Sequence, residues 1–277
     1  MDRDEDPLIH DPDGGLARLR AIMARLRDPA TGCPWDIEQT FASIAPYTIE
    51  EAHEVADAIA RADWPGLVGE LGDLQLQVVY HAQMAREAGH FDLDDVLRAV
   101  CDKMIARHPH VFGSESRDKT AAQQTADWEA AKAAERRARA AGGVLDDVAL
   151  ALPALTRAVK LQNRAARVGF DWPGAGDVLD KLAEELGELT DARASADPDD
   201  VVEEFGDLLF VVANLARHLQ VDPEAALRAA NAKFTRRFRA IEAALAATGR
   251  RPEDSTLAEM DALWEAAKRA ERAPRGP

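Results

Sequence analysis

A chain of 277 residues is long for one helical core and comfortable for two domains of about 100 to 150 residues each. Hydrophobic residues make up 47% of it and charged residues 30%, a balance that excludes a disordered chain. The net charge of −16 argues against a nucleic-acid partner, because a protein of that sign repels a phosphate backbone; an anionic small molecule would need divalent cations or a local basic cluster to bind.

The first residues and the cysteines indicate where the protein works. Residues 1–15 are acidic, and we expect them to form a disordered tail rather than a signal peptide. No run of about 18 apolar residues occurs, so no membrane span is expected. Cys33 and Cys101 form no CxxC pair, which excludes a disulfide framework and a sulfur-rich zinc site. These features predict a cytoplasmic protein.

The chain repeats itself with an offset of 134 residues in its acidic motifs. Those motifs are Glu50-Glu51-Ala52-His53-Glu54 with Glu70-Leu71-Gly72-Asp73, and Glu184-Glu185-Leu186-Gly187-Glu188 with Glu204-Phe205-Gly206-Asp207. Flanking motifs recur too, since Trp128-Glu129-Ala130-Ala131-Lys132 returns letter for letter from Trp264 to Lys268. We therefore expect two homologous helical-bundle domains in tandem, over residues 16–138 and 149–271, joined by a linker over 139–148.

The motifs lie on predicted helices, because alanine, leucine, glutamate and arginine dominate and almost no sheet is expected. Residues 49–59 carry apolar side chains at spacings of three and four, the signature of an amphipathic helix. After a turn at residues 63–65, a second such stripe runs from Leu67 to Val78. The second half repeats the pair. Short connections make consecutive helices antiparallel neighbours, so the acids of each pair should converge.

The converging carboxylates predict a metal site in each half. Residues three apart share a helix face, and the candidate ligands are Glu51, Glu54, Glu70, Asp73, Glu185, Glu188, Glu204 and Asp207. Four like charges at close range are costly unless a cation lies among them, and oxygen ligands without His or Cys favour Mg²⁺, with Mn²⁺ as a substitute. A single acidic run is usually a solvated helix face, but an exact repeat of spacing favours the metal site.

Other chemistries lack the residues they need. A di-iron bundle requires Glu-x-x-His, whereas the chain has aspartate at Asp73 and Asp207. The segment from His53 to Asp57 does not complete a zinc-binding His-Glu-x-x-His helix, and no P-loop motif is present.

Basic and aromatic residues follow each acidic pair. Lys103 with Arg107, and Lys233 with Arg237, are four apart and share a helix face suited to phosphate oxygens, although such pairs are often only surface charge. Trp128 and Trp264 are equally suited to stacking on a base and to packing in a core.

Together with Gly32-Cys33-Pro34-Trp35-Asp36 and His108-Pro109-His110-Val111-Phe112-Gly113, the acidic motifs make the chain resemble the MazG family. The resemblance implies an all-α pyrophosphohydrolase, commonly a homodimer, that holds Mg²⁺ on a nucleoside triphosphate with the eight carboxylates above. It further implies that Glu50 and Glu184 orient or deprotonate the attacking water. The nucleotide-contacting positions it implies are Lys233, Arg237, Trp264 and Lys268.

The predicted reaction is hydrolysis of a nucleoside triphosphate to the monophosphate and pyrophosphate, in housecleaning of the nucleotide pool. Relatives carry a lysine shortly before the second acidic helix, where this chain has Asp199-Asp200 and Pro65-Gly66, so that phosphate contact is lost or supplied elsewhere. In similar tandem proteins the second domain carries most of the activity. Two alternatives stay open: a related helical enzyme specific for dUTP or guanosine tetraphosphate, and a non-enzymatic helical dimer that binds a partner protein.

Overall fold

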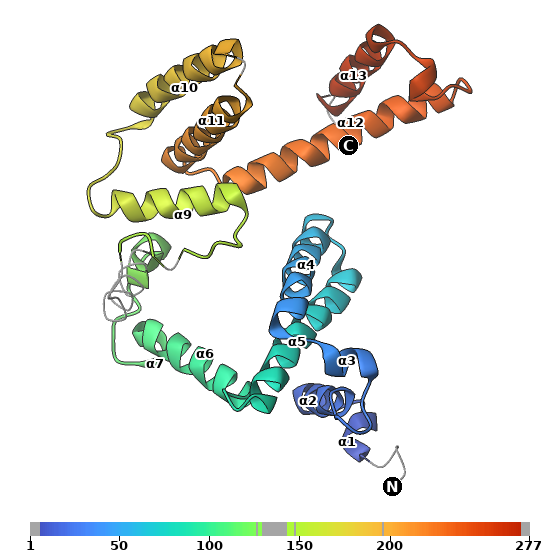
Figure 1. Cartoon of the computed structure of the whole chain (residues 1–277), viewed down its shortest axis with the longest axis vertical. Coiled ribbons are helices and arrows are strands. Elements are labelled where there is room, and N and C mark those ends of the chain that lie inside the picture. The colour runs from blue at the N-terminus through green and yellow to red at the C-terminus, as the bar shows by residue number, and fades with distance from the viewer. Residues whose placement is uncertain (1–5, 126, 129–142, 147, 196, 273–277) are drawn as a thin grey trace. The chain divides into compact units, whose positions relative to one another are not determined.

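The computed structural model of the chain describes residues 6–125, 127–128, 143–146, 148–195 and 197–272. These residues form helices, turns and connecting segments and contain no strand, so the all-α prediction is confirmed. The chain divides into two compact units, Met1–Ala138 and Arg139–Pro277 (Figure 1). No helix in these described residues is both long enough and apolar enough to span a membrane.

The first unit is built around one long helical hairpin. Its helices are α1 (Pro7–His10), α2 (Gly15–Leu26), α3 (Pro34–Glu38), α4 (Phe41–Ala60), α5 (Trp64–Glu87), α6 (Leu93–Arg107) and α7 (Pro109–Phe112), and residues 121–125 are also helical. Helices α4 and α5 pack against each other along their lengths. The turn between them is short because Ala62 adopts a positive φ of 54° and the Asp63 side chain caps α5 by accepting the Gly66 N–H.

A helix occupies part of the expected N-terminal tail. Asp6 caps α1 by accepting the Leu8 N–H, and Pro7 takes the first helical position, where its missing N–H costs nothing. Arg18 on α2 donates from Nε to the Ile9 carbonyl oxygen at 2.8 Å. The sequence predicted disorder throughout residues 1–15, but the structure of this segment is ordered from Asp6 onward. Local capping and the contact with α2 stabilise this segment.

The core of the first unit lies where α2 and α6 meet the hairpin. Met23, Ile44 and Val79 are each at most 2% exposed, and Tyr80 and Leu93 join them. These side chains come from α2, α4, α5 and α6, so burial of this cluster fixes the hairpin that carries the first acidic motif pair.

The second unit repeats the hairpin. Its helices are α9 (Ala154–Ala166), α10 (Ala175–Ser195), α11 (Pro198–His218), α12 (Pro223–Ala246) and α13 (Leu257–Arg272), with a 3₁₀ turn η1 (Pro252–Asp254). Helix α10 packs on α11, and α9 lies against α11. Asp197 and Asp222 cap α11 and α12, and each is followed by proline in the first turn. Helices α12 and α13 form a second hairpin that lies apart from α10 in this unit (Figure 1).

Candidate metal centres and phosphate-binding residues

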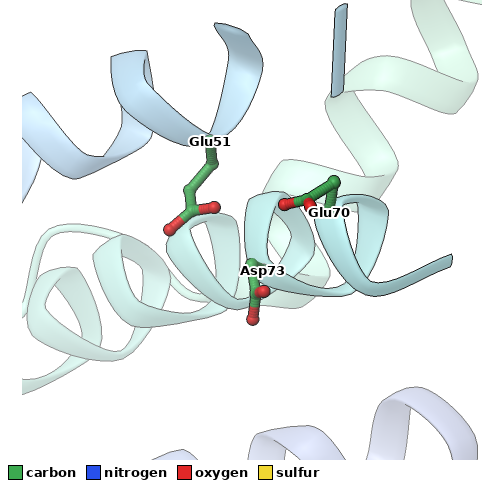
Figure 2. Close-up of side chains that lie close together, drawn as sticks. All are labelled: Glu51, Glu70 and Asp73. Carbon is green, nitrogen blue, oxygen red and sulfur yellow. The ribbon is translucent and has the colours of Figure 1, made fainter. Parts of the chain in front are cut away.

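Three of the predicted ligands of the first unit come together across the α4–α5 seam. Oxygens of Glu51, Glu70 and Asp73 lie within 4.8 Å of one another. Figure 2 shows Glu51 reaching from α4 toward the face of α5 that carries Glu70 and Asp73. Burial raises the pKa of Glu51, and the charges of Asp73 and Glu54 raise it further. The close approach of these carboxylates is therefore electrostatically unfavourable unless a cation lies among them.

The second unit gathers the corresponding helices around Glu185, Glu188 and Glu204, whose oxygens also lie within 4.8 Å of one another. Burial raises the pKa of Glu204, with Glu188 as the largest charge contribution. Glu185 is only 4% exposed, and its Oε2 is buried without a hydrogen-bond partner. A buried carboxylate oxygen with no donor is costly, and a cation would satisfy it.

Each cluster omits one of the four predicted positions. Glu54 stays outside the first and Asp207 outside the second. The omitted positions differ, so each of the four repeat positions belongs to a cluster in at least one unit. All donors in both clusters are carboxylate oxygens, the donor set that suits Mg²⁺ or Mn²⁺ rather than zinc.

Lys181 is a basic member of the second site that the sequence reasoning missed. Its Nζ lies 2.7 Å from Glu184 Oε1, 2.9 Å from Glu185 Oε1 and 3.9 Å from Glu188 Oε2. The spacing of three, four and seven residues on one helix is the signal that would have found it. The position four before Glu51 in the first unit is Tyr47, so that unit has no matching lysine.

The two predicted water-orienting residues have different surroundings. Glu184 is held by Lys181, while its own side chain stays 59% exposed. Glu50 is exposed on α4 and lies close enough to Glu51 to raise the pKa of that residue. Among the described residues, a lysine therefore fixes this carboxylate in the second unit and not in the first.

The basic residues of the second unit form a separate group on α12 and α13. The Arg237 guanidinium lies over the Trp264 ring, 5.4 Å from its centroid, and contacts Glu271. Lys233 is exposed one helical turn before Arg237, and Lys268 pairs with Glu265 at 2.6 Å. Within the described part of this unit, no hydrogen bond or ion pair joins this group to the carboxylate cluster.

In the first unit, Lys103 is exposed on α6 and Arg107 is the last residue of that helix. The His108 ring lies 5.5 Å from the Trp128 ring in an edge-on arrangement. In the repeat, the place of His108 is taken by Phe238, which stacks on Phe234 at 6.0 Å, and the Phe234 ring lies 5.4 Å from the Trp264 ring. The aromatic surroundings of the two tryptophans therefore differ between the units.

Comparison with known proteins agrees with this geometry. The model of the MazG nucleotide pyrophosphohydrolase domain matches twice, at residues 39–112 and 176–241, and each match spans one acidic hairpin. The nucleoside triphosphate pyrophosphohydrolase of Escherichia coli is 52% identical over 92% of this chain and 98% of that protein. The nucleoside triphosphate pyrophosphohydrolase/pyrophosphatase MazG of Thermotoga maritima is 43% identical over 90% of this chain and 94% of that protein.

A third relative, the uncharacterized protein YabN of Bacillus subtilis, is 40% identical over 98% of this chain and 54% of its own length. The repeated domain, the duplicated carboxylate clusters and the near full-length similarity agree, and the chain belongs to the MazG nucleotide pyrophosphohydrolase family.

Proposed function

We propose that the protein hydrolyses nucleoside triphosphates between the α- and β-phosphates, with Mg²⁺ as cofactor, and releases a nucleoside monophosphate and pyrophosphate. The observation that carries the proposal is the pair of carboxylate clusters on duplicated hairpins. The names of the Escherichia coli and Thermotoga maritima relatives support the same reaction. Housecleaning of the nucleotide pool is the role that fits it.

The proposed Mg²⁺ ligands are the four repeat positions of each unit. In the second unit these are Glu185, Glu188, Glu204 and Asp207, and in the first they are Glu51, Glu54, Glu70 and Asp73. Bound Mg²⁺ would withdraw charge from the phosphoryl oxygens and lower the pKa of a water molecule. In a protein with a net charge of −16, the ion also offsets the repulsion of a polyanionic substrate.

The side chains beside each cluster orient the attacking water and accept its proton. Glu184 accepts a proton from the attacking water, and Lys181 keeps that carboxylate beside Glu185. Glu50 occupies the same repeat position in the first unit, but Tyr47 there provides no cation. This difference supports the second unit as the more active one.

The basic groups bind the phosphates that leave. Lys233, Arg237 and Lys268 carry the charge for this task, and the Trp264 ring fixes the orientation of the Arg237 guanidinium from one face. In the first unit the corresponding residues are Lys103, Arg107 and Trp128. No lysine precedes Glu70 or Glu204 closely, so the phosphate contacts come from this later group.

We also propose that the protein is a homodimer. Helix α11 presents Val202, Phe205, Leu209 and Val212, each at least 39% exposed, at spacings of three and four residues, so they lie on one face. Helix α5 presents Val68, Leu71 and Val78 at the same repeat positions. A second copy has the same apolar stripes and would cover them by two-fold symmetry. Light scattering of the purified chain tests this, and a monomer would contradict it.

The test of the reaction is the product released from common ribo- and deoxyribonucleoside triphosphates, with Mg²⁺ and with a chelator. We expect Mg²⁺-dependent pyrophosphate, without orthophosphate. Glu204→Gln and Glu70→Gln each remove one anionic ligand at nearly constant shape, and a loss in only one variant identifies the working unit. The matched control is Glu203→Gln, which neutralises the exposed neighbour of Glu204 outside the cluster.

Two results would contradict the proposal. If Glu204→Gln and Glu70→Gln both kept full turnover at saturating Mg²⁺, the clusters would not hold the catalytic ion. If no nucleotide yielded pyrophosphate, the clusters would be structural or binding sites. Including dUTP and guanosine tetraphosphate in the panel decides whether the enzyme is narrow in specificity.

A further inference from the structure

Glu271, at the end of α13, makes ion pairs that the reaction described above does not require. Its Oε2 accepts hydrogen bonds from Arg237 Nε at 2.9 Å and lies 2.8 Å from Arg237 Nη2. Its Oε1 accepts from Arg236 Nε at 2.8 Å. One carboxylate therefore bridges two guanidinium groups of α12.

The two arginines differ in their surroundings. The side chain of Arg236 is 62% exposed, whereas that of Arg237 is only 15% exposed. The pair with Arg236 resembles an ordinary surface ion pair, which contributes little. The pair with Arg237 is partly shielded from solvent, since the Glu271 side chain is 27% exposed. The carboxylate stays ionised, because the two guanidinium groups lower the pKa of Glu271.

Two partners from α13 fix the Arg237 guanidinium. The Trp264 ring covers one face at 5.4 Å, and Glu271 holds the edge formed by Nε and Nη2. A guanidinium has five N–H donors, so three of them are not used by Glu271. A planar group held on one face and one edge presents its remaining donors in one direction, which is what bidentate phosphate recognition requires.

The sequence repeat keeps the same spacing. Glu271 follows Trp264 by seven residues and Lys268 by three, so the three side chains share one face of α13. In the first half, Glu135 follows Trp128 by the same seven residues and Lys132 by three. A surface ion pair does not require that the glutamate, tryptophan and lysine be repeated together.

We infer that Glu271 is a positioning residue that orients Arg237 for the phosphates of the substrate. The inference rests on the proposed function, since it takes Arg237 to be a phosphate-binding residue. Glu271 itself does not contact the substrate, because its carboxylate would repel a phosphate.

The test compares steady-state kinetics of the full-length wild type, Glu271→Gln, Arg237→Ala and the double variant. We expect Glu271→Gln to raise KM about tenfold and to change kcat less than about threefold, because the phosphate contact is made in both ground and transition states. In the Arg237→Ala background the same change should have no further effect. Binding of inorganic tripolyphosphate with Mg²⁺, measured by calorimetry, should weaken in parallel.

The matched control is Glu259→Gln, which breaks another arginine–glutamate pair on α13, with Arg250 at 3.0 Å, away from Trp264. It should leave KM unchanged. If Glu271→Gln does not fold, Glu271→Asp, which keeps the charge and shortens the side chain, replaces it in the same cycle.

The outcomes separate this inference from the proposed function. A KM unchanged in Glu271→Gln but raised in Arg237→Ala overturns the positioning role alone. If Glu271→Gln raises KM equally with and without Arg237, Glu271 has a merely structural role, and the positioning role is overturned. If Glu271→Gln binds tripolyphosphate more tightly, Glu271 competes with phosphate, and the positioning role is overturned as well. If Arg237→Ala alters neither KM nor tripolyphosphate binding, the phosphate-binding role of Arg237 fails, and the inference fails with it.

Discussion

Replacing Lys181 by methionine should destabilise the second unit in the absence of divalent cations. Lys181 lies 2.7 Å from Glu184 and 2.9 Å from Glu185, and the Glu185 side chain is only 6% exposed. Methionine keeps the length and the helix propensity of lysine, so the main change is the loss of the positive charge. Glu185 would then be buried among like charges without a counter-ion.

The expected cost follows from these distances. Two unit charges 2.9 Å apart attract by about 1.4 kcal/mol at the dielectric constant of water and by about 6 kcal/mol at an effective value of about 20. The Lys181 side chain is 29% exposed, so solvent screens the pair and the lower part of this range applies. We expect a loss of about 2 kcal/mol in the free energy of unfolding.

The assay is urea unfolding in a chelating buffer, followed by tryptophan fluorescence. The tryptophans of the first unit, Trp35, Trp64 and Trp128, are replaced by phenylalanine so that the signal reports the second unit. The control is Lys268→Met, whose partner Glu265 is 44% exposed, so its loss should cost much less than the loss of Lys181. If Lys181→Met cost no more than this control, the reasoning from the burial of Glu185 would be refuted.

Three further predictions concern stability. Gly187→Ala should stabilise the second unit by about 1 kcal/mol in urea unfolding, because a Cβ at this position meets no atom within 4 Å. The first unit has the larger side chain of His53 at the same repeat position. Destabilisation would contradict this, because it would mean that other atoms occupy the space beside Gly187. Met23→Ala should cost about 2 to 5 kcal/mol in the first unit and leave the second unchanged, as calorimetry of the two transitions would show, since Met23 is 1% exposed in the core. Arg250 lowers the pKa of Glu259 from its ordinary value of 4.5 to about 2, so this pair stabilises the fold above pH 4.5 and loses its effect as the pH falls toward 2. An acid titration in which wild type and Glu259→Gln fall in parallel would contradict the last of these.

The helical hairpins and their acidic faces were predictable from the sequence because they depend on local rules. Apolar spacing of three and four residues fixes which face of a helix is buried, and a short turn makes the next helix antiparallel. Glu51, Glu70 and Asp73 therefore converge as expected. The position of Glu54 and Asp207 outside the clusters was not predictable, because it depends on the rotamer that each side chain adopts among its neighbours.

The ion pairs around the site show a second limit of sequence reasoning. Lys181 lies on the same helix as its partners, and its spacing to Glu184 and Glu185 was available in the sequence. In contrast, Glu271 contacts Arg237 across two helices, 34 residues away along the chain. Such a pair depends on the rotation of α13 about its own axis where it packs against α12. The apolar pattern of a single helix defines that rotation only to within about one residue.

Comparison of the two units shows which parts of the site the duplication has kept. The carboxylate positions are identical, because an ion held by oxygen ligands requires both the charge and the spacing. Their neighbours differ: Tyr47 stands where the second unit has Lys181, and His108 where it has Phe238. In the first cluster the pKa of Glu51 is raised by burial and by its acidic neighbours. Without a lysine at the Lys181 position, a cation is the more direct source of compensating charge there, so Mg²⁺ should stabilise the first unit more than the second.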